Sequence, residues 1–160
     1  LFGYSSPFSA HAARYSCRDP FREAQELADI SGFYRAFGLA AEGEASEIGD
    51  HIAVELEFLG LAAYREGQAL SEGLLENAGI CREAQARFLA DHLGRWAPAF
   101  FSKLVLAQAG VYSWLARTAV AFLDQEKEFL EVSFEPFQLP NLVDGDDEER
   151  GCGEIVECKM

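Results

Sequence analysis

Apolar residues recur at three- and four-residue steps along much of the chain, a pattern typical of helices that turn one face toward a core. Asp19-Pro20 supplies a cap acceptor followed by proline at the first helical position, and Gly38 is placed to end that helix. Pro98 should interrupt a later helix or start the next one. The pattern predicts helices over about residues 20–37, 51–65, 82–97, 99–109 and 111–130.

The same stripes predict an all-α, single-domain helical bundle, since no long strand-like alternation is present. The first 18 residues lack a helical period and form an irregular N-terminal segment. We assign residues 1–135 to the helical domain and residues 136–160 to an acidic, cysteine-containing tail that is expected to be flexible. The positions predicted to be largely buried are Phe33, Leu56, Leu59, Phe88, Leu93 and Phe122.

Charge and composition narrow the classes of partner. The chain has 160 residues, and 13 Lys and Arg against 27 Asp and Glu give a net charge of −14, which disfavours nucleic acid as a partner. No window approaches the length of a membrane-spanning helix, and the N-terminus does not resemble a secretory signal, so we expect a cytoplasmic protein without stable membrane insertion. The chain begins at Leu1 without Met, and we expect it to be part of a longer protein.

The segment Glu47-Ile-Gly-Asp-His51 is the most conspicuous polar cluster. Asp50 stands where a helix N-cap belongs, and His51 follows in the expected first helical turn. On the residues alone, the simplest interpretation is that Asp50 only caps its helix and His51 is a surface or packing residue. The alternative is that an apolar groove with carboxylates at one end binds a peptide carrying arginines beside a hydrophobic stretch.

Enzymatic and metal-dependent chemistry is poorly supported. Adjacent residues at a helix start diverge by about 100°, so Asp50 cannot easily orient the ring of His51, and no Gly-x-Ser-x-Gly motif is present. Phosphate-binding glycine loops are also absent. Cys152 and Cys158 are six residues apart, wider than the usual spacing of paired zinc ligands, so metal or cluster handling through them is only a weak alternative. We expect no catalytic residue and no cofactor.

Three stretches together resemble the TorD/DmsD/NarJ family of redox-enzyme maturation chaperones. They are the run from Gln25 to Leu39, the motif Glu47-x-x-Asp50-His51 with the apolar helix that follows it, and the run from Phe88 to Phe100. Their order is that of the family, and the resemblance covers about residues 20–123. Two features depart from the family pattern: Gly49 replaces a proline usual near the motif's centre, and the family's upstream helices are missing.

The resemblance implies an all-helical, cytoplasmic chaperone that is not an enzyme. Its partners would be the apo catalytic subunit of a molybdenum-cofactor oxidoreductase and the twin-arginine signal peptide of that subunit. Carried over residue by residue, the family's peptide-recognition motif falls on Glu47, Asp50 and His51, with Tyr4 as the counterpart of an aromatic residue in the preceding loop. Either a monomer or a dimer is compatible with this family.

Overall fold

The structure, a computed structural model, describes residues 8–15, 20–39 and 49–137. Apart from the short turn η1 (Ala12–Arg14), the elements of this part are α1 (Pro20–Ala36), α2 (Ile52–Ser71), α3 (Leu75–Phe88), the π-helical segment η3 (Leu89–Leu93), α4 (Gly94–Leu106) and α5 (Val111–Phe129). No strand occurs among the described residues, where the one β-type pairing is an isolated bridge between His11 and His51. The predicted all-α bundle is confirmed, with shifted boundaries.

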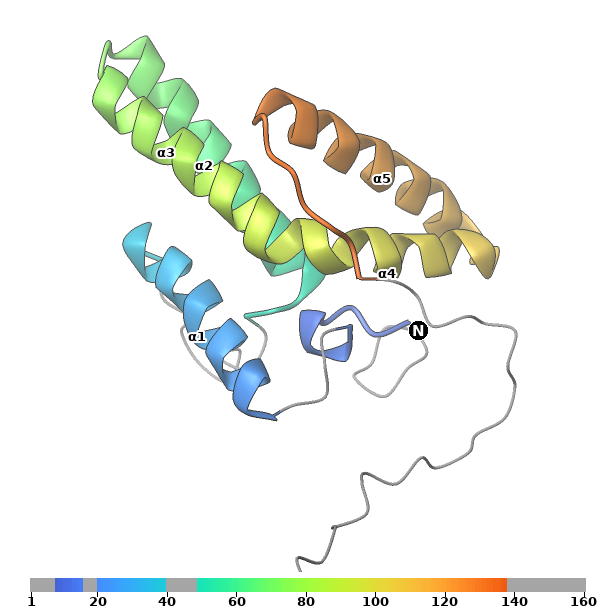
Figure 1. Ribbon diagram of the computed structural model, residues 1–160. Helices are drawn as coiled ribbons and strands as arrows, with labels where there is room; N and C mark the ends of the chain where they lie inside the picture. The colour runs from blue at the N-terminus through green and yellow to red at the C-terminus, as the bar shows by residue number, and fades with distance from the viewer. Residues whose placement is uncertain (1–7, 16–19, 40–48, 138–160) are drawn as a thin grey trace, which may run out of the picture.

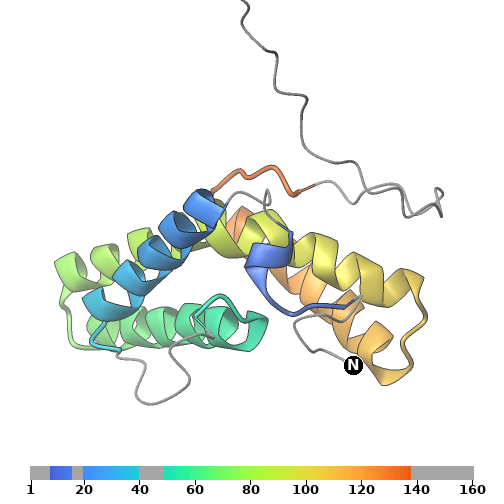
Figure 2. The same ribbon diagram turned by 90° about the horizontal axis from the view of Figure 1, so that it is seen from below.

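Two helix pairs build the molecule. Helices α2 and α3 run antiparallel, and the chain continues through η3 into α4, on which α5 folds back (Figure 1). Seen from below, α1 lies along the α2–α3 pair at one end, and the α4–α5 pair forms the other end (Figure 2). The start of α2 therefore lies near the centre, where the two pairs meet.

An aromatic cluster joins α1 to the α2–α3 pair. The Phe58 and Phe88 rings lie 4.5 Å apart between centroids, and Phe58 is also contacted by Tyr34 of α1 and by Phe37, which directly follows α1. Phe58 and Phe88 are almost completely buried, as are Leu59 and Leu93. The burial predicted for Leu59, Phe88 and Leu93 is confirmed, whereas Phe33 and Leu56 are only partly buried at the edge of the core.

The end of α2 shows why the prediction for this helix was too short. The helix continues through Gly67, which faces open space, and runs to Ser71 instead of ending near residue 65. It stops where Gly73 adopts a φ of +74°, a left-handed conformation that glycine takes without strain. The N–H of Leu74 then donates to the Ala69 carbonyl at 2.8 Å, which completes the helix end.

Pro98 does not interrupt a helix, contrary to the sequence-based expectation. It lies inside α4, and the chain from Leu75 to Leu106 is continuously helical, with a bend between α3 and α4 (Figure 1). The irregularity comes earlier, in η3, which directly precedes the α4 turn that contains Pro98. A π turn is a single wide turn within a helix, and it re-aims the helical face that follows without ending the helix.

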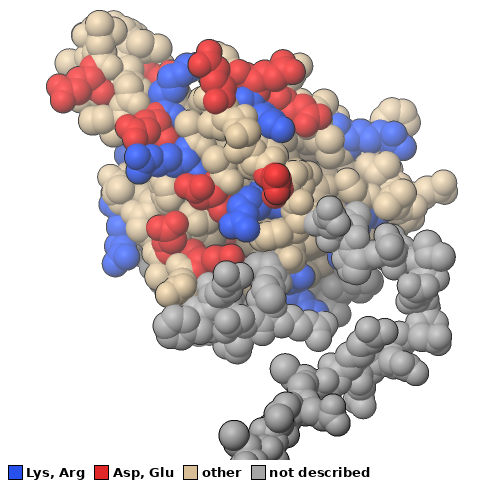
Figure 3. Space-filling model, viewed as in Figure 1, with Lys and Arg blue, Asp and Glu red and all other residues tan. Residues whose placement is uncertain are grey.

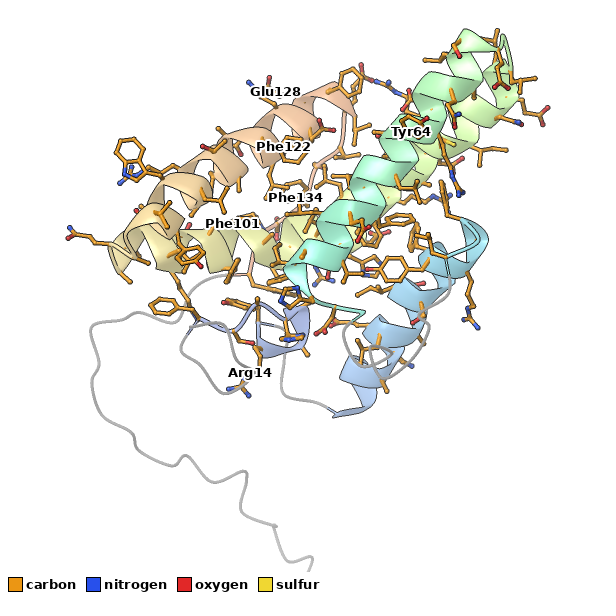
Figure 4. All side chains as sticks on the ribbon, turned by 180° about the vertical axis from the view of Figure 1, so that it is seen from behind. Arg14, Tyr64, Phe101, Phe122, Glu128 and Phe134 are labelled. Atoms are coloured by element: carbon orange, nitrogen blue, oxygen red, sulfur yellow. The ribbon has the colours of Figure 1, made fainter. Side chains whose placement is uncertain are left out.

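Helix α5 was expected to bury Phe122, and this prediction is wrong. Phe122 is 39% exposed, whereas its neighbour Leu123 is 1% exposed against the core. Helix α5 packs mainly on α4, so one apolar stripe is buried and the neighbouring one is left open. Figure 4 shows Phe122 on the side of α5 that is turned toward α2.

After α5 the chain returns across the molecule as a strap (residues 130–137). Phe134 of the strap packs so closely on Gly94 that an added Cβ there would lie 2.7 Å from its ring. Figure 4 places Phe134 between the two helix pairs. The N–H of Phe137 donates to the Arg95 carbonyl at 2.6 Å, so residues 136–137, the first of the predicted tail, are docked on α4. The remainder of that tail, residues 138–160, lies outside the described residues.

Candidate functional site

Asp50 lies at the centre of the polar cluster, but it does not cap the helix that follows it. Its Oδ1 accepts a hydrogen bond from Nδ1 of His11 at 2.9 Å, and its Oδ2 accepts one from the N–H of Ala13 at 3.0 Å. Both carboxylate oxygens are thus engaged by the N-terminal segment, and Asp50 is only 4% exposed. The carboxylate ties residues 11–13 to the start of α2.

His51, and not Asp50, is the N-cap of α2. Its Nδ1 accepts a hydrogen bond from the N–H of Ala53 at 3.2 Å, and its backbone is extended, with φ −77° and ψ 137°. The expectation that Asp50 caps and His51 occupies the first turn is therefore wrong by one residue. Burial lowers the pKa of His51, the neighbouring His11 lowers it further, and Asp50 opposes both.

The backbone fixes the same contact. The N–H of Ala12 donates to the Asp50 carbonyl at 3.1 Å, and the N–H of Ile52 donates to the Ala10 carbonyl at 2.9 Å. Ala10 is buried, and the hydroxyl of Tyr15 donates to the Ser9 carbonyl at 2.9 Å. Residues 8–15 are consequently held against the start of α2, with Ser9 and Ala10 buried.

Behind the start of α2 lies a buried acid that the sequence analysis did not select. Glu55 is 0% exposed, and Nε1 of Trp96 donates to both of its carboxylate oxygens at 3.1 and 3.2 Å. Burial raises the pKa of Glu55 well above its usual range. A carboxyl group that keeps its proton is the form such a site tolerates best. The feature of the sequence that could have revealed this buried acid is its position within the apolar run Ile52-Ala-Val-Glu-Leu56.

Tyr34 connects α1 to the loop before the site. Its hydroxyl donates to the Gly49 carbonyl at 2.7 Å. Burial raises the pKa of Tyr34, and the nearby Glu55 and Asp50 raise it further, so the phenol stays protonated as a donor. The position of Gly49 is therefore fixed from α1 as well as from the N-terminal segment.

An apolar groove of about 280 Å³ opens beside His51, between the start of α2 and the α4–α5 pair. Its lining contains no charged side chain, and His51 and Tyr112 are its polar members. Phe101, which Figure 4 places between α4 and the neighbouring helices, contributes from α4. The residues that define its sides are Ala10, His51, Leu56, Phe101, Leu115 and Ala119.

A second hollow, of about 370 Å³, lies at the far end of the α2–α3 pair. Its lining includes the polar side chains Arg65, Gln68, Glu72 and Asn77. It is well separated along the helices from Asp50 and His51. Chemically it does not offer the continuous apolar surface found beside His51.

The structure brings together Asp50, His51 and His11, of which only the first two were predicted. The rings of His11 and His51 pack edge to face, with centroids 5.0 Å apart. Glu47 and Tyr4 lie outside the described residues, and so do Cys152 and Cys158 of the weak metal alternative. Among the residues that are described, no group of three or more His, Cys, Asp and Glu could hold a metal ion.

A protein-family model described as nitrate reductase delta subunit matches residues 2–102. This match covers more than half of the chain, and the chain belongs to that family. The resemblance drawn from the motifs is thereby confirmed.

Relatives with assigned names agree with this membership. The chain is 34% identical to the chaperone protein TorD of Vibrio cholerae over 115 residues, which are 71% of this chain and 50% of that protein. It is 33% identical to the perchlorate reductase assembly chaperone protein of Dechloromonas aromatica over 110 residues, which are 68% of this chain and 45% of that protein. The chain thus spans about half the length of the curated relatives it matches. No solved structure matches it.

Proposed function

We propose that this protein is a chaperone, not an enzyme, that binds the apo form of a molybdenum-cofactor oxidoreductase and its twin-arginine signal peptide during maturation. The observation that carries the proposal is the apolar groove beside Asp50 and His51 in a chain of this family. The names of the relatives support the same reading, since one is a reductase assembly chaperone and others are TorD chaperones. We place its action in the cytoplasm, before export of the client.

The groove suits the apolar stretch of such a peptide. Its lining offers almost only carbon atoms, and burying apolar side chains there is favourable by about 25 cal/mol per Å². Leu115 is 61% exposed at its side, so apolar surface is already presented to solvent. An apolar groove with few polar groups is the usual design for recognising a hydrophobic peptide segment.

Charge suits the arginines of the same peptide. The net charge of −14 attracts a cationic partner before contact. On the face shown in Figure 3, acidic and basic side chains are interspersed over the helices. Within the proposed site, Glu47 and Asp50 attract the arginines, His51 hydrogen-bonds the peptide, and Tyr4 adds an aromatic contact. Both carboxylate oxygens of Asp50 already accept hydrogen bonds, from His11 and Ala13. Asp50 would therefore attract the arginines through its negative charge and not through a direct hydrogen bond.

A matched pair of charge substitutions tests the groove. Leu115→Asp introduces a carboxylate into it, whereas Tyr64→Asp introduces one at a similarly exposed position, 64% against 61%, that does not line it. A synthetic peptide with two adjacent arginines followed by a Leu- and Ala-rich stretch is titrated into each protein. We expect Leu115→Asp to weaken binding roughly tenfold or more, because the new charge must be desolvated, and Tyr64→Asp to bind like wild type. Equal affinities for all three proteins would contradict the proposal.

A further inference from the structure

The strap lies on the helices in the way that an extended peptide ligand does. From Glu131 to Glu135 its side chains alternate, with Val132 and Phe134 partly buried and the residues between them exposed. A period of two is that of an extended chain lying on a surface. Figure 1 shows this segment running from the end of α5 back to the start of α4. The protein thus binds an extended segment of its own chain.

The surface that receives the strap, here called the strap seat, consists of Gly94, Arg95 and Lys127. Gly94 follows the π turn, and its N–H donates to the Leu89 carbonyl. An added Cβ at position 94 would lie 2.5 Å from that carbonyl oxygen and 2.7 Å from the ring of Phe134. The π turn therefore requires glycine, and the missing side chain leaves a notch that an aromatic ring fills. Turns of this kind inside helices occur frequently at functional sites.

Two cations of the seat lie over the aromatic rings of the strap. The ammonium group of Lys127 is 4.9 Å from the centre of the Phe134 ring, and the guanidinium carbon of Arg95 is 4.7 Å from the centre of the Phe137 ring. A cation over a ring face at this distance attracts the ring electrostatically. The seat therefore recognises two aromatic rings three residues apart, and the notch at Gly94 receives the first of them.

The backbone of the strap is held loosely. Among the described residues, the N–H of Phe137 is its one backbone group bonded to α4, and residues 133–136 make no backbone–backbone hydrogen bond. Where the strap begins, Glu131 has a φ of +55°, a left-handed conformation that favours glycine. A segment with an exposed backbone and few hydrogen bonds opens at a lower free energy than the helices around it.

The strap seat is separate from the apolar groove beside His51. The lining of that groove includes neither a residue of the strap nor a residue of the seat. The strap also follows the range, residues 2–102, that the family model matches. What binds in the seat is for both reasons a different question from what binds in the groove.

We propose that the strap seat is a second peptide-binding site, for an extended segment with two aromatic residues three positions apart, and that the strap closes this site. Phe134 and Phe137 occupy the positions that the two rings of such a partner take. Release of the strap opens the notch at Gly94 and uncovers the two cations. Because a tethered segment competes at an effective concentration in roughly the millimolar range, the closed protein binds such a partner weakly. This second site is independent of the proposed function.

A labelled peptide with the sequence of residues 130–137, Leu-Glu-Val-Ser-Phe-Glu-Pro-Phe, is the probe. In the full chain, Phe134→Ala takes the ring out of the notch, and we expect this variant to bind the probe at least about tenfold more tightly than wild type, whose own strap competes. The control, Trp114→Ala, removes an aromatic side chain that is 77% exposed near the start of α5, and it should bind like wild type. A probe with both phenylalanines replaced by alanine should bind none of the proteins. Equal affinity of Phe134→Ala and wild type for the probe would overturn the proposal.

A second measurement uses wild type alone, so it does not depend on the folding of a variant. The N–H of Phe137 reports whether the strap is seated, because it donates to the Arg95 carbonyl. At several millimolar, the probe should displace the strap and speed hydrogen exchange at Phe137 severalfold, while the amides of α4 stay as slow as before. Unchanged exchange at Phe137 would mean that the strap is a fixed part of the fold.

The arginine-containing peptide of the groove distinguishes the second site from a general effect on the bundle. Since no strap residue lines the groove, Phe134→Ala and wild type should bind that peptide equally. A change in the affinities for both peptides would show that the strap supports the whole bundle, and would count against a separate site. Failure of the arginine-containing peptide to bind any of the proteins would reject the proposed function and leave the result with the probe intact.

Discussion

The two sides of the groove are built differently. On the side of α2, Ala10 is 2% exposed, Ile52 is 9% exposed, and Asp50 is buried with both carboxylate oxygens paired. On the side of α5, Leu115 is 61% exposed, and Phe122 continues the same face at steps of three and four residues beyond it. The α2 side of the groove is thus buried and held in place by hydrogen bonds, whereas the α5 side is an apolar surface exposed to solvent. We infer that the fixed α2 side sets the position of the proposed peptide and that the exposed α5 side supplies contact area.

The largest expected effect separates the two faces of α5. Leu123→Ala should lower the free energy of unfolding by about 2–5 kcal/mol, because the side chain is 1% exposed in the core. Phe122→Ala, one position away, should cost less, about 1–2 kcal/mol, because 39% of this residue already faces solvent. Denaturant titrations measure both. If Phe122→Ala proved as costly as Leu123→Ala, α5 would have a packing partner on that face.

The second prediction concerns the carboxylate of Asp50, which holds the α2 side of the groove to the N-terminal segment. Asp50→Ala leaves the donors of His11 and Ala13 without their carboxylate, which should cost about 1–3 kcal/mol of stability. The control is Glu83→Ala, which removes a carboxylate from an exposed pair with Arg87 and should change stability by less than about 0.5 kcal/mol. Chemical denaturation of the two variants gives the comparison. If both variants lost a similarly small amount of stability, the α2 side of the groove would not depend on Asp50.

The smallest expected effect concerns Glu55, which is buried in the first turn of α2, and this effect depends on pH. Because the folded-state pKa of Glu55 is raised by burial, the native protein keeps a proton that the unfolded chain releases as pH rises above about 4.3. The contribution of this group to stability is therefore complete in acid and declines toward the folded-state pKa. Glu55→Gln keeps an acceptor for Trp96 and has no proton to lose, so it should match wild type in acid and become relatively more stable as pH rises. Parallel pH profiles of stability would contradict a protonated Glu55.

The helical class and three of the buried positions could be predicted because periodicity reports directly on the side of a helix that meets a core. Phe122 could not be placed, because the pattern shows that a face is apolar but not whether another element covers it. Asp50 and His51 were recognised as a pair, yet their roles were exchanged. Which of two neighbours caps a helix depends on a tertiary contact, here the one between Asp50 and His11, which is 39 residues away. Glu55 was missed for a related reason, since its partner Trp96 is 41 residues away.

The π-helical segment Leu89–Leu93 sets the rotation of α4 about its axis relative to α3. In an α-helix each residue advances the face by about 100°. Inserting a single residue into this segment would therefore turn all of α4 by about a quarter of a revolution relative to α3. Trp96 would then leave the carboxyl group of Glu55, and the face of α4 that carries α5 would point elsewhere. Length in this segment is for that reason constrained more tightly than composition, and a one-residue insertion should be more damaging here than most substitutions.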